Sequence, residues 1–237
     1  MNLVSLSEQK IEIANKIVSA YSFLYQVGDA LINHKPLSVV RMGDGEHTLL
    51  SEITNSDDLD SHLTSYDDAW HQRMGTAGIT RLELYKRMME AGNTCSHFAP
   101  SVSGLVLGSF DLFDFFAPRD HYVDNFFVNI WSDEQKVELF KTAQSVLFIH
   151  RNRATADAMQ KRAKQYLGVR VRYLELSNWE QTDAVIADAV ADTEARLVLF
   201  AGGPASKYLS PRIAASNKVV LDLGNSTDQW TLLRVPH

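Results

Sequence analysis

The sequence predicts an α/β fold: a Rossmann-like, mostly parallel sheet with helices on both faces. From residue 145 onwards, short apolar runs typical of buried strands alternate with stretches of helical periodicity. The runs lie at residues 145–149, 169–176, 196–201 and 218–223, and the helical stretches near residues 154–167, 179–192 and 205–215. Strands joined through helices pair in parallel with right-handed crossovers, so this half of the chain is expected to form a parallel sheet.

The first part of the chain adds one strand and an N-terminal helix. Apolar residues recur at helical intervals over residues 11–31, and this helix is expected to pack on the sheet. The apolar run at residues 37–40 predicts the first strand. Residues 54–68 are expected to form a polar surface loop, and residues 80–92 another helix. Residues 96–131 are rich in aromatic side chains and show no clear period.

Composition limits the class of protein. The chain has 237 residues, 45% of them hydrophobic, and no linker, repeat or low-complexity tract, so we expect a single domain over residues 1–237. A formal net charge of -6 disfavours nucleic acid as a partner. The one cysteine, Cys95, excludes an intramolecular disulfide and a cysteine-based zinc site, and is expected to be buried.

Targeting signals are absent from the sequence. The N-terminus has no signal-peptide pattern, and no run approaches the roughly 20 apolar residues that span a membrane. We therefore expect a cytoplasmic protein with no membrane span.

The most informative motif is the hexapeptide R-M-G-D-G-E at residues 41–46, directly after the first predicted strand. Gly43 and Gly45 allow the backbone to make a sharp turn, or a ligand to approach closely, because glycine has no side chain. Asp44 and Glu46 are separated by one residue, so in an extended turn both carboxylates can reach one point at the end of the sheet. This arrangement suits a hard divalent cation, which takes oxygen ligands and often shares them with a phosphate. An ordinary strand-to-helix turn capped by Asp44 is the alternative.

Polar residues also follow the later predicted strands, where the loops of a parallel sheet share one edge. After the strand at residues 145–149, Arg151 and Arg153 could pair with a diphosphate, because guanidinium matches phosphate oxygens bidentately. After the strand at residues 196–201, a Gly-Gly-Pro turn opens a helix whose N-terminus could bind phosphate. Surface arginines and an ordinary strand-to-helix turn are the alternatives.

Taken together, these segments resemble the GT-D-type glycosyltransferases, a bacterial family in which Asp-x-Glu takes the place of the usual Asp-x-Asp. Residues 41–46 are similar to its R-[FY]-G-D-G-E motif, residues 199–207 to its L-G-P-x-A-K turn, and residues 220–224 to its A-x-D-x-G-H strand end. The resemblance covers about residues 37–230. The sequence departs from the pattern at Met42, which replaces an aromatic residue, and at Asn225, which replaces a histidine.

The resemblance implies a sugar-nucleotide-binding fold and transfer of a hexose from a nucleotide donor, such as UDP-glucose, to a glycan or other hydroxyl acceptor. It implies Mn²⁺ or Mg²⁺ held by Asp44 and Glu46. Asp228 and Asp222 are candidates for the catalytic base, although Asp222 could simply cap its strand end. The residues expected at the donor are Arg41, Gly43, Gly45, Arg151, Asn152, Arg153, Gly202, Gly203, Pro204, Ser206, Lys207 and Asn225.

Two other functions stay open. A non-catalytic sugar-nucleotide-binding module would bind nucleotide without turnover, and Asn225 is the residue that raises this alternative. A metal-dependent phosphohydrolase using Asp44 and Glu46 would release inorganic phosphate, whereas a transferase would release the whole nucleoside diphosphate. The aromatic-rich segment is expected to be core, but it could line an acceptor groove or form a homo-oligomer interface.

Overall fold

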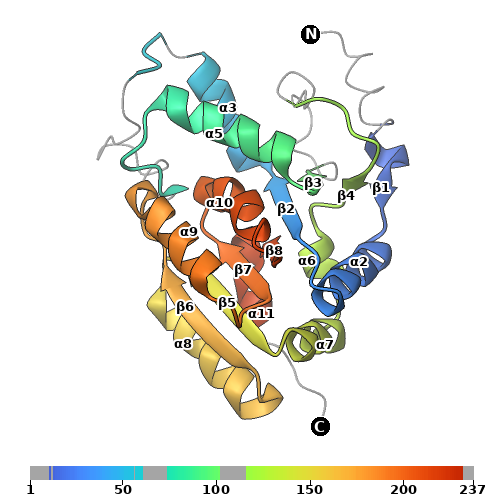
Figure 1. Ribbon diagram of the computed structural model, residues 1–237. Helices are drawn as coiled ribbons and strands as arrows, with labels where there is room; N and C mark the ends of the chain where they lie inside the picture. Colours follow the sequence, from blue (N-terminus) through green and yellow to red (C-terminus); the bar gives the residue numbers. More distant parts are fainter. Residues whose placement is uncertain (1–10, 12, 56, 61–73, 102–115, 232–237) are drawn as a thin grey trace.

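The computed structural model describes residues 11, 13–55, 57–60, 74–101 and 116–231. Its centre is a six-stranded sheet in the order β3-β2-β8-β7-β5-β6, with every neighbouring pair parallel (Figure 1). The strands are β2 (Leu37–Met42), β3 (His97–Pro100), β5 (Ser145–His150), β6 (Arg170–Glu175), β7 (Leu197–Ala201) and β8 (Val219–Asp222). The α/β class and the parallel sheet predicted from the sequence are confirmed.

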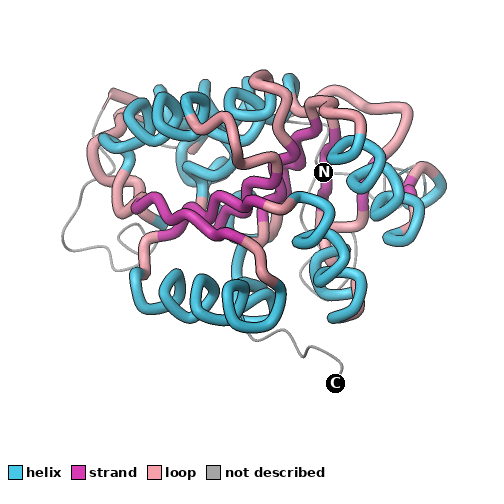
Figure 2. The backbone as a smooth tube through the Cα atoms, turned by 60° about the horizontal axis from the view of Figure 1, so that its bottom comes forward, coloured by secondary structure: helices cyan, strands magenta, loops and turns pink. Residues whose placement is uncertain are grey.

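Helices cover both faces of this sheet, so the strands form a layer between them (Figure 2). One face carries α2 (Ala20–Ile32), α6 (Phe127–Ile130), α7 (Asp133–Ala143), α8 (Arg153–Arg162) and α11 (Thr227–Thr231). The other carries α3 (Asp44–Thr54), α5 (Arg81–Thr94), α9 (Thr182–Ala191) and α10 (Pro204–Ala214). Alternate strand residues serve the two cores, since Val146 and Phe148 belong to the first and Leu147 and Ile149 to the second.

The described residues also form several short elements. They are β1 (Ile17–Val18), β4 (Tyr122–Val123), the π-helical turn η3 (Ala163–Leu167) and the 3₁₀ turns η4 (Trp179–Gln181) and η5 (Gly224–Ser226). Among the described residues, none of the helices has the length and apolarity that crossing a membrane requires.

The helix predicted over residues 11–31 is interrupted rather than continuous: residues 11 and 13–15 are helical, as predicted, but residues 17–18 are not. Ile17 and Val18 form β1, which pairs in parallel with β4, and α2 begins only after Ser19. Both residues of β1 are β-branched, which favours a strand. Ser19 then caps α2, because its Oγ accepts a hydrogen bond from the Ser22 N–H at 3.1 Å. The rest of the prediction is confirmed, since α2 packs on the sheet.

The aromatic segment at residues 96–131 contains β3, β4 and α6, none of which the sequence predicted. Most of its described aromatic side chains are core, as expected, and Trp131 donates its indole N–H to the Ala20 carbonyl at 2.8 Å. Phe126 and Ile130 are exposed, at 38% and 45%. Part of this segment, residues 102–115, and most of the predicted loop at residues 54–68 lie outside the described residues.

The chain direction changes at the middle of the sheet. From β5 the chain continues through α8 to β6 on one side, whereas from β7 it continues through α10 to β8 on the other. Helices α8 and α10 lie on opposite faces. The loops after β5 and β7 therefore diverge, which opens a crevice at the carboxyl edge where sheets of this kind bind ligands.

Candidate functional site

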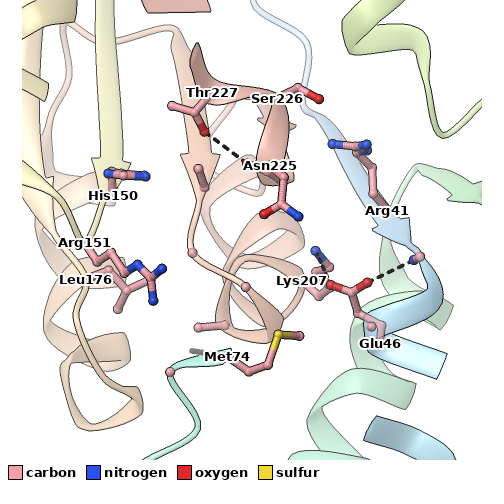
Figure 3. A pocket seen from close by; sticks show the side chains of 18 of the residues that line it. Arg41, Glu46, Met74, His150, Arg151, Leu176, Lys207, Asn225, Ser226 and Thr227 are labelled. Carbon is pink, nitrogen blue, oxygen red and sulfur yellow. Dashed lines mark hydrogen bonds and ion pairs between the residues drawn. The ribbon is translucent and has the colours of Figure 1, made fainter. Parts of the chain in front are cut away.

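A pocket of about 830 Å³ lies at this carboxyl edge and is lined by the loops that follow β2, β5, β6, β7 and β8. Arg41 and Glu46 stand on one side, and His150 and Arg151 on the opposite side (Figure 3). Asn225 lies between them. The loops after β2, β5, β7 and β8, which were predicted to share one sheet edge, thus line one cavity, together with residues that follow β3 and β6.

A buried ammonium group forms the centre of charge in the pocket. The Nζ of Lys207 lies 2.9 Å from Glu46 Oε1 and 2.7 Å from Asp222 Oδ2. Lys207 and Asp222 are buried, and the side chain of Glu46 is 13% exposed. Because buried charges are stable only when paired, these three groups depend on one another.

Their pKa values reflect this pairing. Burial by itself would lower the pKa of Lys207, but the charges of Asp222 and Glu46 outweigh it and raise that pKa. Burial would raise the pKa of Glu46, but the charge of Lys207 and hydrogen bonds from Lys207 and the Gly43 N–H lower it. Lys207 is therefore a fixed cation at neutral pH and Glu46 a fixed anion.

Glu46 also caps the helix that follows β2. Gly43 is the N-cap of α3, and its N–H donates to Glu46 Oε2 at 3.0 Å. Glu46 occupies the third helical position, from which a glutamate reaches back to the N-cap. Each of its carboxylate oxygens thus has one protein partner. Gly45 lines the pocket, and the side chain of Asp44 lies outside the described part of the structure.

The metal prediction can be compared with these contacts. Among the described residues, no three His, Cys, Asp or Glu side chains gather as a metal cluster. Magnesium, however, is usually held by one or two carboxylates together with substrate phosphates. A carboxylate has about four lone-pair sites, and the contacts of Glu46 with Lys207 and the Gly43 N–H occupy two of them. Glu46 therefore fits a cation that a phosphate ligand completes, but not one enclosed by protein alone.

Arg41 is held rigidly at the rim of the pocket. Its Nε donates to Asn125 Oδ1 at 2.7 Å and its Nη1 to the Leu223 carbonyl at 2.6 Å. Burial lowers its pKa, while the charges of Asp222 and Glu46 act in the opposite direction. The absence of a side chain at Gly224 leaves space for the Arg41 guanidinium, since a Cβ there would lie 2.9 Å from Arg41 Nη1.

The predicted Gly-Gly-Pro turn opens α10 at the pocket. Gly203 is the N-cap, with a φ of 60°, and a Cβ there would lie 2.8 Å from the Met74 carbonyl oxygen. Gly202 and Gly203 line the pocket, whereas Pro204 and Ser206 do not. Pro204 occupies the first helical position, and Ser206 donates its hydroxyl to the Gly203 carbonyl at 2.6 Å.

Three consecutive residues after β5 were predicted to bind the donor, but only the first of them lies at the pocket. Arg151 lines the pocket, but Asn152 and Arg153 do not. Asn152 caps α8, and its Oδ1 accepts the Ala154 N–H at 2.9 Å. Arg153 donates to Asp157 at 2.8 Å on the surface of the same helix. Of the two arginines predicted to pair with a diphosphate, only Arg151 faces the cavity.

The loop after β8 contributes Asn225 and Asp228 to the lining, but not Asp222. Asp222 is fully buried, and its Oδ1 accepts the Gly224 N–H at 3.1 Å. The geometry therefore favours Asp228 over Asp222 as a group that can reach a ligand.

Several lining residues were not predicted. Asn125 pairs with Arg41 across 84 residues of sequence, and no local pattern signals such a contact. His150 is the last residue of β5, so its position at a strand end was the one available signal. Phe126 and Asn129 come from the segment without a period. The remaining unpredicted polar residues of the lining are Ser101, Thr155, Ser177, Asn178, Ser226, Thr227 and Gln229.

No protein-family model matches this sequence, and neither does any curated protein. Solved structures do match. One is described as "The highly conserved domain of unknown function 1792 has a distinct glycosyltransferase fold"; the TM-score is 0.65 at 17% identity, over 97% of this chain and 85% of that chain. Another, "A New Glycosyltransferase (DUF1792) from Streptococcus sanguinis", gives 0.54 at 15% identity, over 87% and 82%. At these identities the likeness shows the fold, and the Rossmann-like glycosyltransferase fold predicted by resemblance is confirmed.

Proposed function

We propose that this protein is a metal-dependent glycosyltransferase that moves a hexose from a nucleotide sugar, such as UDP-glucose, to a hydroxyl of a glycan or other acceptor. The observation that carries the proposal is the pocket itself. At the carboxyl edge of a sheet with a glycosyltransferase fold, it gathers Arg41, Glu46, Arg151 and Lys207 with the N-terminus of α10. These groups suit an anionic donor with a sugar attached.

Donor binding is assigned to the loops after β5 and β7. The guanidinium of Arg151 can pair with diphosphate oxygens, and the Gly202–Gly203 turn lets a phosphate approach the N-terminus of α10. As the glycosidic bond breaks, negative charge grows on the departing nucleoside diphosphate. Fixed positive charge and backbone N–H groups aimed at that position stabilise it more than they stabilise the intact donor.

A divalent cation, Mn²⁺ or Mg²⁺, is proposed at Asp44 and Glu46, completed by the donor diphosphate. Bound there, it would add positive charge against the departing diphosphate. Lys207 keeps Glu46 ionised and oriented at this point, and buried Asp222 in turn fixes Lys207. Asp222 is therefore assigned a positioning role.

The acceptor is assigned to the side of the pocket near α6. Phe126 and Asn129 line the pocket there and are exposed, so they can offer a sugar ring an apolar face and a hydrogen-bonding amide. Asp228, which also lines the pocket, is the proposed base that takes the proton of the acceptor hydroxyl.

One feature of the pocket also supports an alternative function, that of a non-catalytic binding module. Asn225 lies in the pocket where the resembling family has a histidine, so a non-catalytic sugar-nucleotide-binding module remains the second candidate. The phosphohydrolase is less well supported, because it needs a further carboxylate beside the metal and no such cluster occurs among the described residues.

A thermal-shift screen of UDP-, GDP-, dTDP- and CMP-sugars, each with and without Mn²⁺, tests the proposal. A ligand that binds only the folded protein raises the melting temperature. We expect one donor class to raise it, and to do so only with metal present. Folded protein that no nucleotide sugar stabilises would contradict both the transferase and the binding module.

A further inference from the structure

We infer that His150 binds the donor diphosphate as a hydrogen-bond donor through its Nε2–H, and that it is not the base of the reaction. The inference rests on the proposed function and adds a residue that neither the motifs nor the resemblance pointed to. It follows from the position of the ring, from the partner of Nδ1 and from the chemistry of the neighbouring groups.

The imidazole is held firmly at the end of β5. Two hydrogen bonds fix the backbone carbonyl of His150, one from the Tyr173 hydroxyl at 2.9 Å and one from the Leu176 N–H at 3.2 Å. The ring stacks on Phe148 with a centroid distance of 5.4 Å and an interplanar angle of 13°. It stands in the pocket opposite Glu46 (Figure 3). A ring fixed in this way presents one edge to whatever occupies the cavity.

The partner of Nδ1 decides which nitrogen carries the proton. The backbone N–H of Asn152 donates to Nδ1 of His150 at 2.9 Å. A neutral imidazole has a single N–H, so with Nδ1 as acceptor the proton lies on Nε2. The opposite tautomer would donate from Nδ1 to the Asn152 carbonyl at the longer distance of 3.3 Å and would leave the Asn152 N–H without this acceptor.

The surroundings favour this neutral form. Burial lowers the pKa of His150, and the charge of Arg151 lowers it further, whereas the Asn152 carbonyl near Nδ1 and the charge of Asp228 act in the opposite direction. A base would need a free lone pair on Nε2, and the hydrogen bond from Asn152 places the proton there instead. Protonation would leave the Nε2–H in place, so this nitrogen donates in both charge states.

The neighbours of His150 identify the ligand class. No hydrogen bond to Nε2 is formed by any part of the chain that the structure describes. Beside it on the same wall, the guanidinium of Arg151 is also donor-only, and the Gly202–Gly203 turn brings the N-terminus of α10 to the cavity. Together, these three sets of donors suit a group that accepts hydrogen bonds without donating them. Ionised phosphate oxygens have this property, and sugar hydroxyls do not.

A matched pair of amide variants tests the inference. The amide nitrogen of His150→Gln can reach the place of Nε2, whereas that of His150→Asn reaches only the place of Nδ1. Binding of UDP, GDP, dTDP and inorganic pyrophosphate is measured by calorimetry, with Mn²⁺ present, in wild type and in both variants. Losing a hydrogen bond to a charged group is expected to weaken binding by roughly 10-fold or more in His150→Asn, and His150→Gln should recover most of it. Urea unfolding checks that both variants fold.

The pH profile of kcat/KM separates a donor from a base. If His150 is a hydrogen-bond donor, kcat/KM should depend on pH in the same way in wild type and in His150→Gln. If His150 is the base, His150→Gln should lose most of its turnover, and its kcat/KM should no longer fall at low pH. Equal binding in all three proteins, or the loss of that fall at low pH, would overturn the inference. Wild type that binds pyrophosphate but no nucleotide would refute the proposed function alone, provided that His150→Asn still weakens pyrophosphate binding. Wild type that binds neither would refute both.

Discussion

At the scale of single residues, Lys207 links the stability of the fold to the chemistry of the pocket. It lies between Glu46, in the first turn of α3, and Asp222, at the end of β8. The same contacts that keep its charge inside the protein also set the position of Glu46, the predicted metal ligand. Substitutions here should therefore change stability and function together.

We predict that Lys207→Met destabilises the protein by about 3–5 kcal/mol, because removing one partner leaves buried charge uncompensated. Urea unfolding measures this loss. Lys218→Met is a matched control, since Lys218 is also buried but donates to the carbonyl oxygens of Asp192 and Ala195. It should cost less, about 1–3 kcal/mol, because the hydrogen-bond partners left behind are neutral carbonyl groups. A control loss as large as that of Lys207→Met would contradict the account.

The pH dependence of stability should report on Glu46. Its pKa is lower in the folded state than the usual value of 4.5, so the unfolded chain binds more protons in acid and stability falls there. The contribution is fully present above pH 4.5 and is lost as the pH falls through the folded pKa.

We therefore predict that Glu46→Gln is less stable than wild type at pH 7 by about 1.5–3 kcal/mol, the range for a hydrogen bond to a charged group. The gap should close in acid, where wild-type Glu46 is protonated as well. Unfolding by urea between pH 3 and 7 measures both proteins. A gap that does not change with pH would show that the charge of Glu46 contributes nothing.

At the scale of elements, the start of α10 depends on Gly203. Its positive φ and its approach to the Met74 carbonyl leave no space for a side chain. Gly203→Ala is expected to cost about 1–3 kcal/mol of strain and to weaken nucleotide binding by displacing the helix N-terminus. Gly168→Ala is the control, because Gly168 has a φ of 65° but nothing within 4 Å of an added Cβ. It should lose some stability and keep full binding.

The element α6 should govern the acceptor rather than the donor. If Phe126 stacks on an acceptor sugar, Phe126→Ala should raise the KM for that acceptor about 2- to 12-fold, the effect of about 0.5–1.5 kcal/mol from an aromatic contact. Donor affinity should not change. Ile130→Ala removes an exposed apolar side chain of the same helix that does not line the pocket, and should leave both constants unaltered. An equal effect of both substitutions would refute this assignment.

At the scale of the whole molecule, the sequence predicted what local patterns determine. The strands from β5 onwards and α5, α8, α9 and α10 follow from periodicity, and parallel order then places their loops at one edge. The edge strand β3 was missed because four residues that include His97 and Pro100 carry no strand signal until β2 pairs with them.

For the candidate site too, local patterns predicted part of the lining, and tertiary contacts determined the rest. Strand order located the pocket, but capping decided which residues enter it. Asn152 and Ser206 form hydrogen bonds with backbone groups at helix N-termini, and Asp222 pairs with Lys207. The pairing of Asn125 with Arg41 joins segments far apart in the chain, which one sequence cannot show. The sequence thus predicted the sheet edge at which the candidate pocket lies, and the structure shows which of the predicted residues line that pocket.

The most direct test of the central claim is phosphorus NMR of nucleotide sugars incubated with the protein, Mn²⁺ and a panel of glycan acceptors. Transfer cleaves the bond between the sugar and the diphosphate, so the account predicts resonances of the free nucleoside diphosphate, and their loss in Asp228→Asn. Inorganic phosphate as the product would identify a phosphohydrolase instead. Donor that binds but stays intact with every acceptor would contradict the claim of transfer and identify a binding module.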